Sequence, residues 1–183
     1  MDTLECIKTR RSMRKFTEEP VSDEILQELL EAVRWAPSWA NTQTSEVIVV
    51  REQATKEKIA GILADKNPAT KGVLQAPVIL VMCAKTGIAG YYNESAVTDK
   101  GDWYMFDAGI ASQNLCLAAH ALGLGTVHVA HLDHQALDEL LGLPAEVKSI
   151  EIIPLGYPGK EGKAPPRREI GEFVHSEKYG NKY

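Results

Sequence analysis

WYMFDAGIASQNLCLAAHALGLG, residues 103–125, is the longest segment of the chain with a helical pattern. Bulky apolar side chains alternate in it with Ala, Gly and Ser. Because small residues let another helix approach closely, we expect a central helix over residues 103–122. The pattern fits a subunit interface and a core helix within one subunit about equally well. Gly123 and Gly125 then end the helix.

The segments on both sides of this helix alternate between strand and helix patterns. Ser22 is a good helix cap, an apolar stripe follows it, and Pro37 stops the pattern. The apolar run at 78–84 is typical of a buried strand. The full prediction comprises helices at 22–36, 55–63 and 132–141 and strands at 47–50, 78–84, 126–130 and 147–155. This order predicts a layered α+β fold with one sheet, a single domain over residues 1–183, and a C-terminal arm from about 160 to 183.

Composition restricts the function of the chain. It has 183 residues and a net charge of -5, which argues against general binding to nucleic acids or anionic membranes. Its N-terminus is charged where a signal peptide would be apolar. Three widely spaced cysteines are typical of reduced thiols in the cytoplasm. We therefore expect a cytoplasmic protein without membrane or nucleic-acid partners.

Positive charge is concentrated in two clusters. The first contains Lys8, Arg10, Arg11, Arg14 and Lys15, and the second contains Lys163, Arg167 and Arg168. If the clusters met in space, they would form a pocket for a phosphate monoester, because a guanidinium group donates two parallel hydrogen bonds to phosphate oxygens. Two separate solvated patches are the alternative, and composition alone does not decide between them.

Four short motifs resemble those of the FMN-dependent nitroreductase family. They are RRSMRKF at 10–16, APSWANTQ at 36–43, the helix and turn at 107–125, and PPRR at 165–168. Their order and spacing follow the family from about residue 4 to residue 175. The resemblance implies a three-layer fold with a central mixed sheet flanked by helices. It also implies a homodimer with a long central interface helix and FMN at the interface.

The resemblance also assigns roles to individual residues. The FMN phosphate, ribityl chain and pyrimidine edge fall to Arg10, Arg11, Ser12 and Arg14, and Arg167, with Arg168 beside it, closes on the phosphate. The loop donated by the other subunit contributes Pro37, Ser38, Trp39, Asn41 and Gln43. The segment facing the flavin ring is His128, Val129, Ala130 and His131, with the Ala130 N–H at flavin N5, and Asn67 and Lys71 lie near the ring edge.

The implied reaction passes hydride from NADH or NADPH through flavin N5 to a small organic acceptor in alternating (ping-pong) half-reactions. A nitroaromatic, a quinone and an unsaturated carbonyl compound are the candidate acceptors. No catalytic acid or base is needed, because the flavin carries the chemistry. Reductive dehalogenation, biosynthetic ring oxidation and flavin breakdown are alternatives within the family, and a flavin-binding protein without turnover is an alternative outside it.

Two departures from the family motifs concern the acceptor side. Thr44 and Ser45 follow Gln43 where the family usually has Pro-Trp, and Ala130-His131 replaces an acid or Gly-Gly. These differences leave the identity of the acceptor open.

Histidines and aromatic residues near these motifs have two interpretations each. His128, His131 and His134 recur every third residue, but they cross a predicted strand-to-helix junction, so pocket or surface histidines are favoured over a metal site. Tyr91, Tyr92 and Trp103 bracket a polar segment and fit a lid over the flavin as well as core packing.

Overall fold

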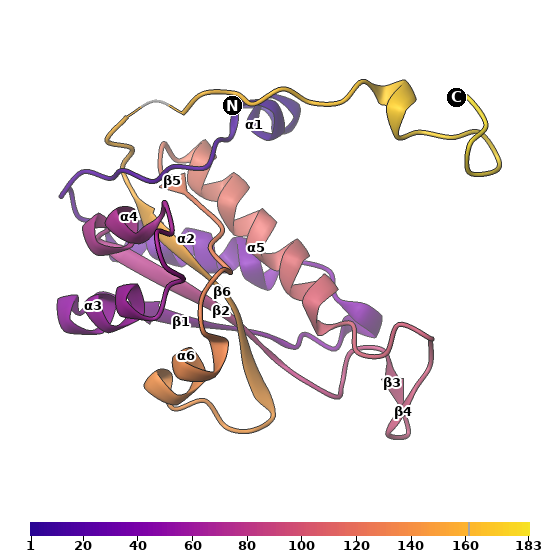
Figure 1. Ribbon diagram of the computed structural model, residues 1–183, viewed down its shortest axis with the longest axis horizontal. Coiled ribbons are helices and arrows are strands. Elements are labelled where there is room, and N and C mark those ends of the chain that lie inside the picture. Colours follow the sequence, from indigo (N-terminus) through magenta and orange to yellow (C-terminus); the bar gives the residue numbers. More distant parts are fainter. Residues whose placement is uncertain (161) are drawn as a thin grey trace.

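A four-stranded sheet forms the centre of the computed structural model, which describes residues 1–160 and 162–183. The strand order is β1 (Ser45–Val50), β2 (Val78–Lys85), β6 (Val147–Gly156) and β5 (Gly125–Thr126) (Figure 1). These neighbours pair antiparallel, and a parallel bridge between Ser12 and Thr126 makes the sheet mixed.

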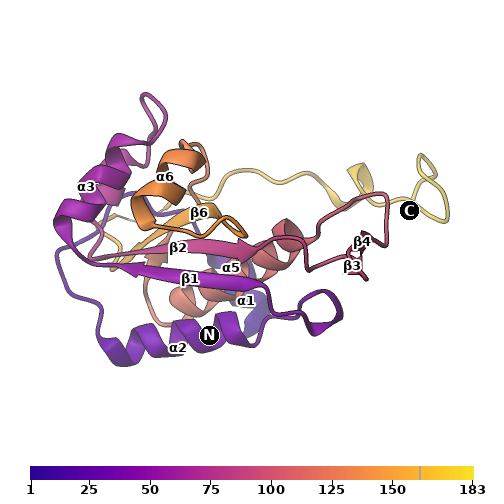
Figure 2. The same ribbon diagram turned by 90° about the horizontal axis from the view of Figure 1, so that it is seen from below.

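Helices cover both faces of the sheet (Figure 2). One face packs against α2 (Asp23–Arg34) and α5 (Tyr104–Ala121), and the other against α3 (Gln53–Gly61), α4 (Thr70–Gln75) and α6 (His134–Leu141). Strand β2 is buried along residues 78–84, and its alternate side chains enter the two cores. The predicted α+β fold with three layers is therefore confirmed.

Local sequence signals account for the helix ends. The Ser22 hydroxyl accepts a hydrogen bond from the Ile25 N–H at 3.3 Å and caps α2. The Asp133 carboxylate does the same for the Ala136 N–H at 3.0 Å at the start of α6. Gly142 ends α6 with a φ of 67°, a conformation that glycine adopts without steric cost.

Helix α5 lies across one face of the sheet and buries its small residues there. Ala111, Leu115 and Ala119 are in the core, whereas Met105 and Phe106 are 54% and 60% exposed. The described chain therefore leaves two large apolar side chains in the first turn of this helix open. None of the helices in the described residues is both long and apolar enough to cross a membrane.

Several short elements were not predicted or differ from the prediction. The strand expected at 126–130 is reduced to β5, after which Val129 pairs alone with Ile152. Helix α4 has six residues and no side-chain cap, and the hairpin of β3 (Tyr91–Tyr92) and β4 (Ser95–Ala96) has two residues in each strand. Elements this short have too few residues for a periodic pattern.

Both ends of the chain run along the outside of the sheet. Helix α1 (Thr3–Thr9) carries Lys8 in its last turn and ends just before the rest of the first basic cluster, and the C-terminal segment passes near it and extends beyond the body (Figure 1). The single short helix of that segment is η2 (Ile170–Glu172). Phe173 is 49% exposed and Tyr179 is 93% exposed, so this arm has little cover from its own chain.

Candidate functional site

The two basic clusters meet in one cavity. Lys8 and Arg11 from the N-terminal cluster and Arg167 from the C-terminal cluster line a cavity of about 360 Å³ with Ile7, Ala164 and Pro165. Three cations around a small cavity favour an anion with two negative charges, and Arg and Lys suit a phosphate group. The alternative of two separate solvated patches does not hold for these three residues.

Arg10 and Arg11 take different positions beside this cavity. The Nη1 of Arg11 donates to the carbonyl oxygens of Lys8 and Arg10 at 2.6 and 2.8 Å, which fixes its guanidinium at the end of α1. The Nη1 of Arg10 is buried and has no hydrogen-bond partner among the described residues. A buried donor without a partner is costly, so Arg10 fits a site that an anionic oxygen completes.

The charge of this region also acts on His120, near the end of α5. Its Nε2 lies 2.8 Å from the Thr9 hydroxyl. Burial lowers the pKa of His120, and the positive charges of Arg10 and Arg11 lower it further. These contacts place the basic cluster at the C-terminal end of α5.

Main-chain bonds tie the segment after Arg11 to the sheet. The Met13 N–H donates to the Thr126 carbonyl at 2.8 Å, and the Gly159 N–H donates to the Lys15 carbonyl at 2.9 Å. A Cβ atom on Gly72 would lie 2.7 Å from the Arg14 carbonyl oxygen, so α4 and its Lys71 lie directly against this segment. The structure thus brings Ser12, Arg14 and Lys71 to one side of the molecule.

The segment at residues 128–131 adjoins this region through Asn67. The Asn67 Nδ2 donates to the His131 carbonyl at 3.1 Å, and its Oδ1 accepts from the Ala69 N–H at 2.9 Å. Val129 is fixed by two main-chain bonds to Ile152, of 3.0 and 2.9 Å. The Ala130 N–H has no acceptor within the described part of the chain. Ala130 therefore has a backbone donor that is not used within the described chain.

His128 forms an ion pair behind the same segment. Its Nδ1 lies 3.0 and 2.9 Å from the two carboxylate oxygens of Glu151, which is 8% exposed. Interactions with Cys116 and Glu151 raise the pKa of His128 to about 10. The imidazole is therefore positively charged at neutral pH.

His134 bonds to Ser149 and the Ala130 carbonyl, and no group of three metal-binding side chains occurs in residues 1–160 and 162–183.

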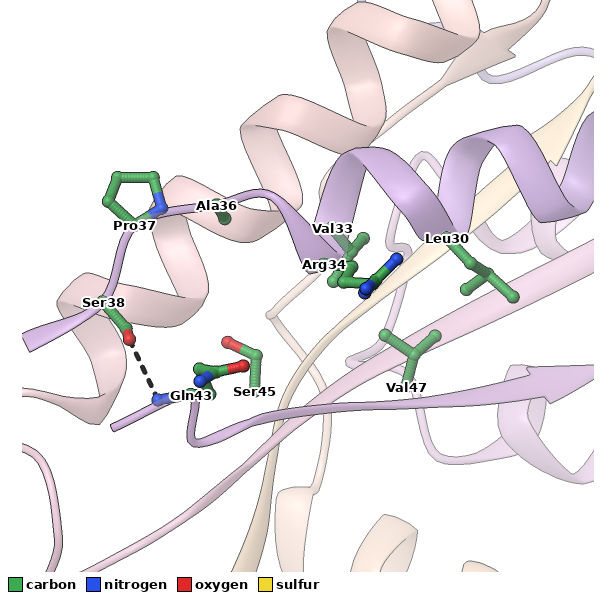
Figure 3. A pocket seen from close by; sticks show the side chains of 9 residues that line it. All are labelled: Leu30, Val33, Arg34, Ala36, Pro37, Ser38, Gln43, Ser45 and Val47. Atoms are coloured by element: carbon green, nitrogen blue, oxygen red, sulfur yellow. Dashed lines mark hydrogen bonds between the residues drawn. The ribbon is translucent and has the colours of Figure 1, made fainter. Parts of the chain in front are cut away.

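The second predicted part of the site is the loop after α2. The Ser38 hydroxyl accepts from the Gln43 N–H at 2.9 Å, which closes the loop (Figure 3). Ser38 and Gln43 also line a cavity of about 270 Å³ whose floor is Leu30, Val33 and Val47. Asn41 and Gln43 line an adjacent cavity with Pro37. Pro37, Ser38, Asn41 and Gln43 thus share one surface, whereas Trp39 lines neither cavity and packs against Trp103.

This loop and the basic cluster lie at opposite ends of α5. Trp39 bonds to Asp107 in the first turn of the helix, whereas Thr9 reaches His120 near its end. The two helix residues are thirteen positions apart, which corresponds to roughly 20 Å at the helical rise per residue. The two predicted halves of the site are therefore not adjacent within one chain.

Some residues fall outside these groups, and others were not predicted as site residues. Arg168 packs its guanidinium over the Phe173 ring, 5.4 Å from the centroid, and does not line the basic cavity.

Lys8 lines the basic cavity and could have been selected, since it belongs to the first basic cluster. Asp107 and Glu151 were missed because their partners, Trp39 and His128, are distant in the sequence. A single acid within an apolar pattern was the only available signal.

Comparisons with known proteins point to one family. The model of the nitroreductase family matches residues 7–157. The FMN reductase (NAD(P)H) of Bacillus subtilis is 34% identical over 98% of this chain and 75% of its own length. The NADPH-flavin oxidoreductase of Vibrio harveyi is 30% identical over 97% of this chain and 75% of its own length.

A solved structure extends the similarity to the fold. The crystal structure of a nitroreductase family protein from Clostridium difficile matches with a TM-score of 0.83 at 25% identity, covering 97% of this chain and 99% of that chain. The family match covers most of the chain. The chain therefore belongs to the nitroreductase family.

Proposed function

We propose that this protein binds FMN at a homodimer interface and transfers reducing equivalents from NAD(P)H to a small nitroaromatic, quinone or unsaturated carbonyl acceptor. The observation that supports it best is the meeting of Arg11 and Arg167 with Lys8 in one cavity, beside the unpartnered guanidinium of Arg10. The family and the two flavin-dependent relatives confirm the coarser prediction, an FMN-dependent NAD(P)H oxidoreductase.

The residues of the chain bind and orient the cofactor. Arg10, Arg11 and Arg167 hold the phosphate, and Arg14 lies where its charge stabilises the pyrimidine edge. The Ala130 N–H, free in the described chain, would donate a hydrogen bond to the flavin and so orient its reacting edge. When bound, FMN supplies the hydride chemistry at N5, so the chain needs no catalytic acid or base.

A second copy of the chain completes the site in this proposal. The Ser38–Gln43 loop and the basic cluster are at opposite ends of α5, so one chain does not bring them to the same ligand. Exposed apolar side chains on α1 and α5, including Leu4, Ile7 and Phe106, offer a surface for a two-fold contact. The exposed arm with Phe173 provides further apolar area for the partner. A cytoplasmic location is part of the proposal, because Cys6, Cys83 and Cys116 are buried and free.

Flavin analysis and turnover test the proposed chemistry. The purified protein should release FMN and not FAD on denaturation, since a cavity for a terminal phosphate leaves no place for an adenosine. NADH and NADPH oxidation should accelerate when menadione or a nitroaromatic is added. Binding of FMN without any acceptor-dependent rate would indicate a flavin-binding protein without turnover. Failure to bind FMN after reconstitution would refute the proposal.

Subunit exchange tests the shared site. Arg10→Ala damages the phosphate contact and Asn41→Ala damages the donated loop. In a mixed dimer one site carries both lesions and the other is intact. Mixing equal amounts should restore FMN binding to at most about a quarter of all sites, since half the dimers are mixed and half their sites are intact. No recovery, with exchange verified by mass spectrometry, would show that each flavin is held by one chain.

A further inference from the structure

The loop over residues 38–44 has a conformation that its own sequence resists. Ala40, Asn41 and Gln43 have φ values of 42°, 58° and 51°, although none of them is glycine. Left-handed backbone at residues with a Cβ atom is unfavourable and persists only where surrounding contacts enforce it. The side-chain hydroxyls of Thr42 and Thr44 are also buried without a partner among the described residues. Something outside the loop has to hold it.

The strongest external tie comes from Asp107 on α5. Its two carboxylate oxygens accept the Trp39 N–H at 3.0 and 3.1 Å. The indole of Trp39 packs on the indole of Trp103, with ring centroids 4.9 Å apart. Trp103 precedes Asp107 by one helical turn. The start of α5 therefore holds both the backbone and the side chain of the first residue of η1 (Trp39–Asn41).

Burial of the Asp107 carboxylate is unfavourable unless a hydrogen bond, here from the Trp39 N–H, compensates for it. The residue is 1% exposed, and in the described part of the chain its carboxylate accepts hydrogen bonds from the Trp39 N–H alone. Burial raises the pKa of Asp107, and the bond from Trp39 opposes that rise. An apolar residue would suit the surrounding core better. The carboxylate at this position thus serves the loop.

We propose that Asp107 is a positioning residue that fixes the Ser38–Gln43 loop in the conformation that presents Asn41 and Gln43 to the ligand. This inference rests on the proposed function for the identity of that ligand. Without the carboxylate, the left-handed residues relax and the loop populates other conformations. The apparent Kd for FMN then rises in inverse proportion to the fraction of loops that remain competent.

The loop position has its own spectroscopic signal. Trp35, Trp39 and Trp103 are the tryptophans of the chain, and Trp35 is 76% exposed. In a Trp35→Phe background, the near-ultraviolet circular dichroism of the stacked pair reports whether Trp39 stays against Trp103. The measurement does not require FMN.

Asp107→Leu removes the acceptor while keeping the number and branching of the side-chain heavy atoms, and Asp107→Asn retains one acceptor oxygen. Asp138→Leu is the matched control, because Asp138 also accepts a backbone N–H from another element, that of Ser149 at 2.9 Å, but on the opposite face of the sheet. All variants are compared in the Trp35→Phe background for dichroism, for thermal unfolding and for FMN affinity by fluorescence titration.

Asp107→Leu should lose the Trp39–Trp103 signal and bind FMN about tenfold more weakly, as expected when one loop in about ten remains competent. Asp107→Asn should retain most of the Trp39–Trp103 signal and most of the FMN affinity. Asp138→Leu should change neither the signal nor the affinity, while its Tm falls about as far as that of Asp107→Leu. If Asp107→Leu does not fold, Asp107→Ser, too short to reach the Trp39 N–H, takes its place with the same expectations.

Two results would overturn the inference. Retention of the tryptophan signal in Asp107→Leu would show that the loop does not depend on the carboxylate. Equal FMN affinity in Asp107→Leu and Asp138→Leu, with the signal lost, would show that the loop position does not matter to the ligand. If the parent protein itself binds no FMN, the proposed function fails, and the dichroism still decides whether Asp107 holds the loop.

Discussion

The basic segment at residues 10–15 and the loop at residues 38–43 are both irregular, yet they are held in opposite ways. Main-chain hydrogen bonds join Met13 to Thr126 and Lys15 to Gly159. The loop has main-chain bonds only within itself, from Asn41 to Ser38 and from Thr42 to Trp39, and is otherwise held through the Asp107 carboxylate and the Ser38 hydroxyl. The side chains of the basic segment are therefore not needed for its attachment to the sheet, whereas some side chains of the loop are needed to keep its shape.

This difference separates two kinds of mutational effect. Truncating a side chain on a backbone that is paired to the sheet removes a ligand contact and leaves the segment in place. Truncating a side chain that bonds to the loop backbone moves the loop, and every residue on it loses its position. Ligand affinity and local backbone order should thus change independently in the first region and together in the second.

The largest effect is expected in the basic segment and its C-terminal counterpart. Arg10→Ala and Arg167→Ala should each weaken FMN binding about thirtyfold, since a charge-assisted hydrogen bond contributes about 2 kcal/mol. Amide exchange at Met13 should stay as in the parent, because its bond to Thr126 is between main-chain atoms. Fluorescence titration and hydrogen exchange measure the two quantities.

Arg51→Ala is the control for this pair. Arg51 forms an exposed ion pair with Asp23 at 2.6 Å, far from either basic cluster in the sequence. Its loss should leave FMN affinity unchanged. Parental affinity in both Arg10→Ala and Arg167→Ala would mean that the cavity they adjoin is not the phosphate site.

The same difference explains how much was predictable from the sequence. The basic segment was predictable because charge is visible in composition, and α2, β2 and α5 were predictable because their patterns are long and regular. The loop was predicted as loop and as part of the site, but only through a short motif. Its conformation was not predictable, since it depends on Asp107, 68 positions from Trp39. No local pattern contains a contact of that separation.

A smaller effect is expected at Ser38. Ser38→Ala removes the bond to the Gln43 N–H, a loss of about 1 kcal/mol that reduces the competent loop population and weakens FMN binding roughly fivefold. Amide exchange at Gln43 should accelerate together with the loss of affinity. This joint change is what distinguishes the loop from the basic segment.

Ser22→Ala is the matched control, since the Ser22 hydroxyl also accepts one backbone N–H. Loss of this cap should lower Tm by roughly 2–4 °C, as about 1 kcal/mol does in a chain of this length. FMN affinity should not change. If Ser22→Ala and Ser38→Ala weaken FMN binding equally, the effect comes from general destabilisation and the proposed difference between the regions is wrong.

A third effect, on stability, is expected in the segment at residues 128–131, where both kinds of support occur. Val129 is paired to Ile152 by its main chain, and His128 is bound to Glu151 by its side chain. The pH dependence of stability can separate the two, because only the side-chain interaction titrates. The pKa of His128 is raised to about 10 in the folded protein, against about 6.5 in an unfolded chain.

Between these two values the folded state binds more protons than the unfolded state, so the free energy of unfolding falls as pH rises. The contribution of the charged His128 is complete below pH 6.5 and is lost as pH rises through about 10. The Tm difference between the parent and His128→Gln should therefore be largest near pH 6 and shrink toward pH 10, whereas His131→Gln, at an exposed position, should follow the parent. Parallel curves for the parent and His128→Gln would mean that His128 carries no charge beside Glu151, and that the main chain alone holds this segment.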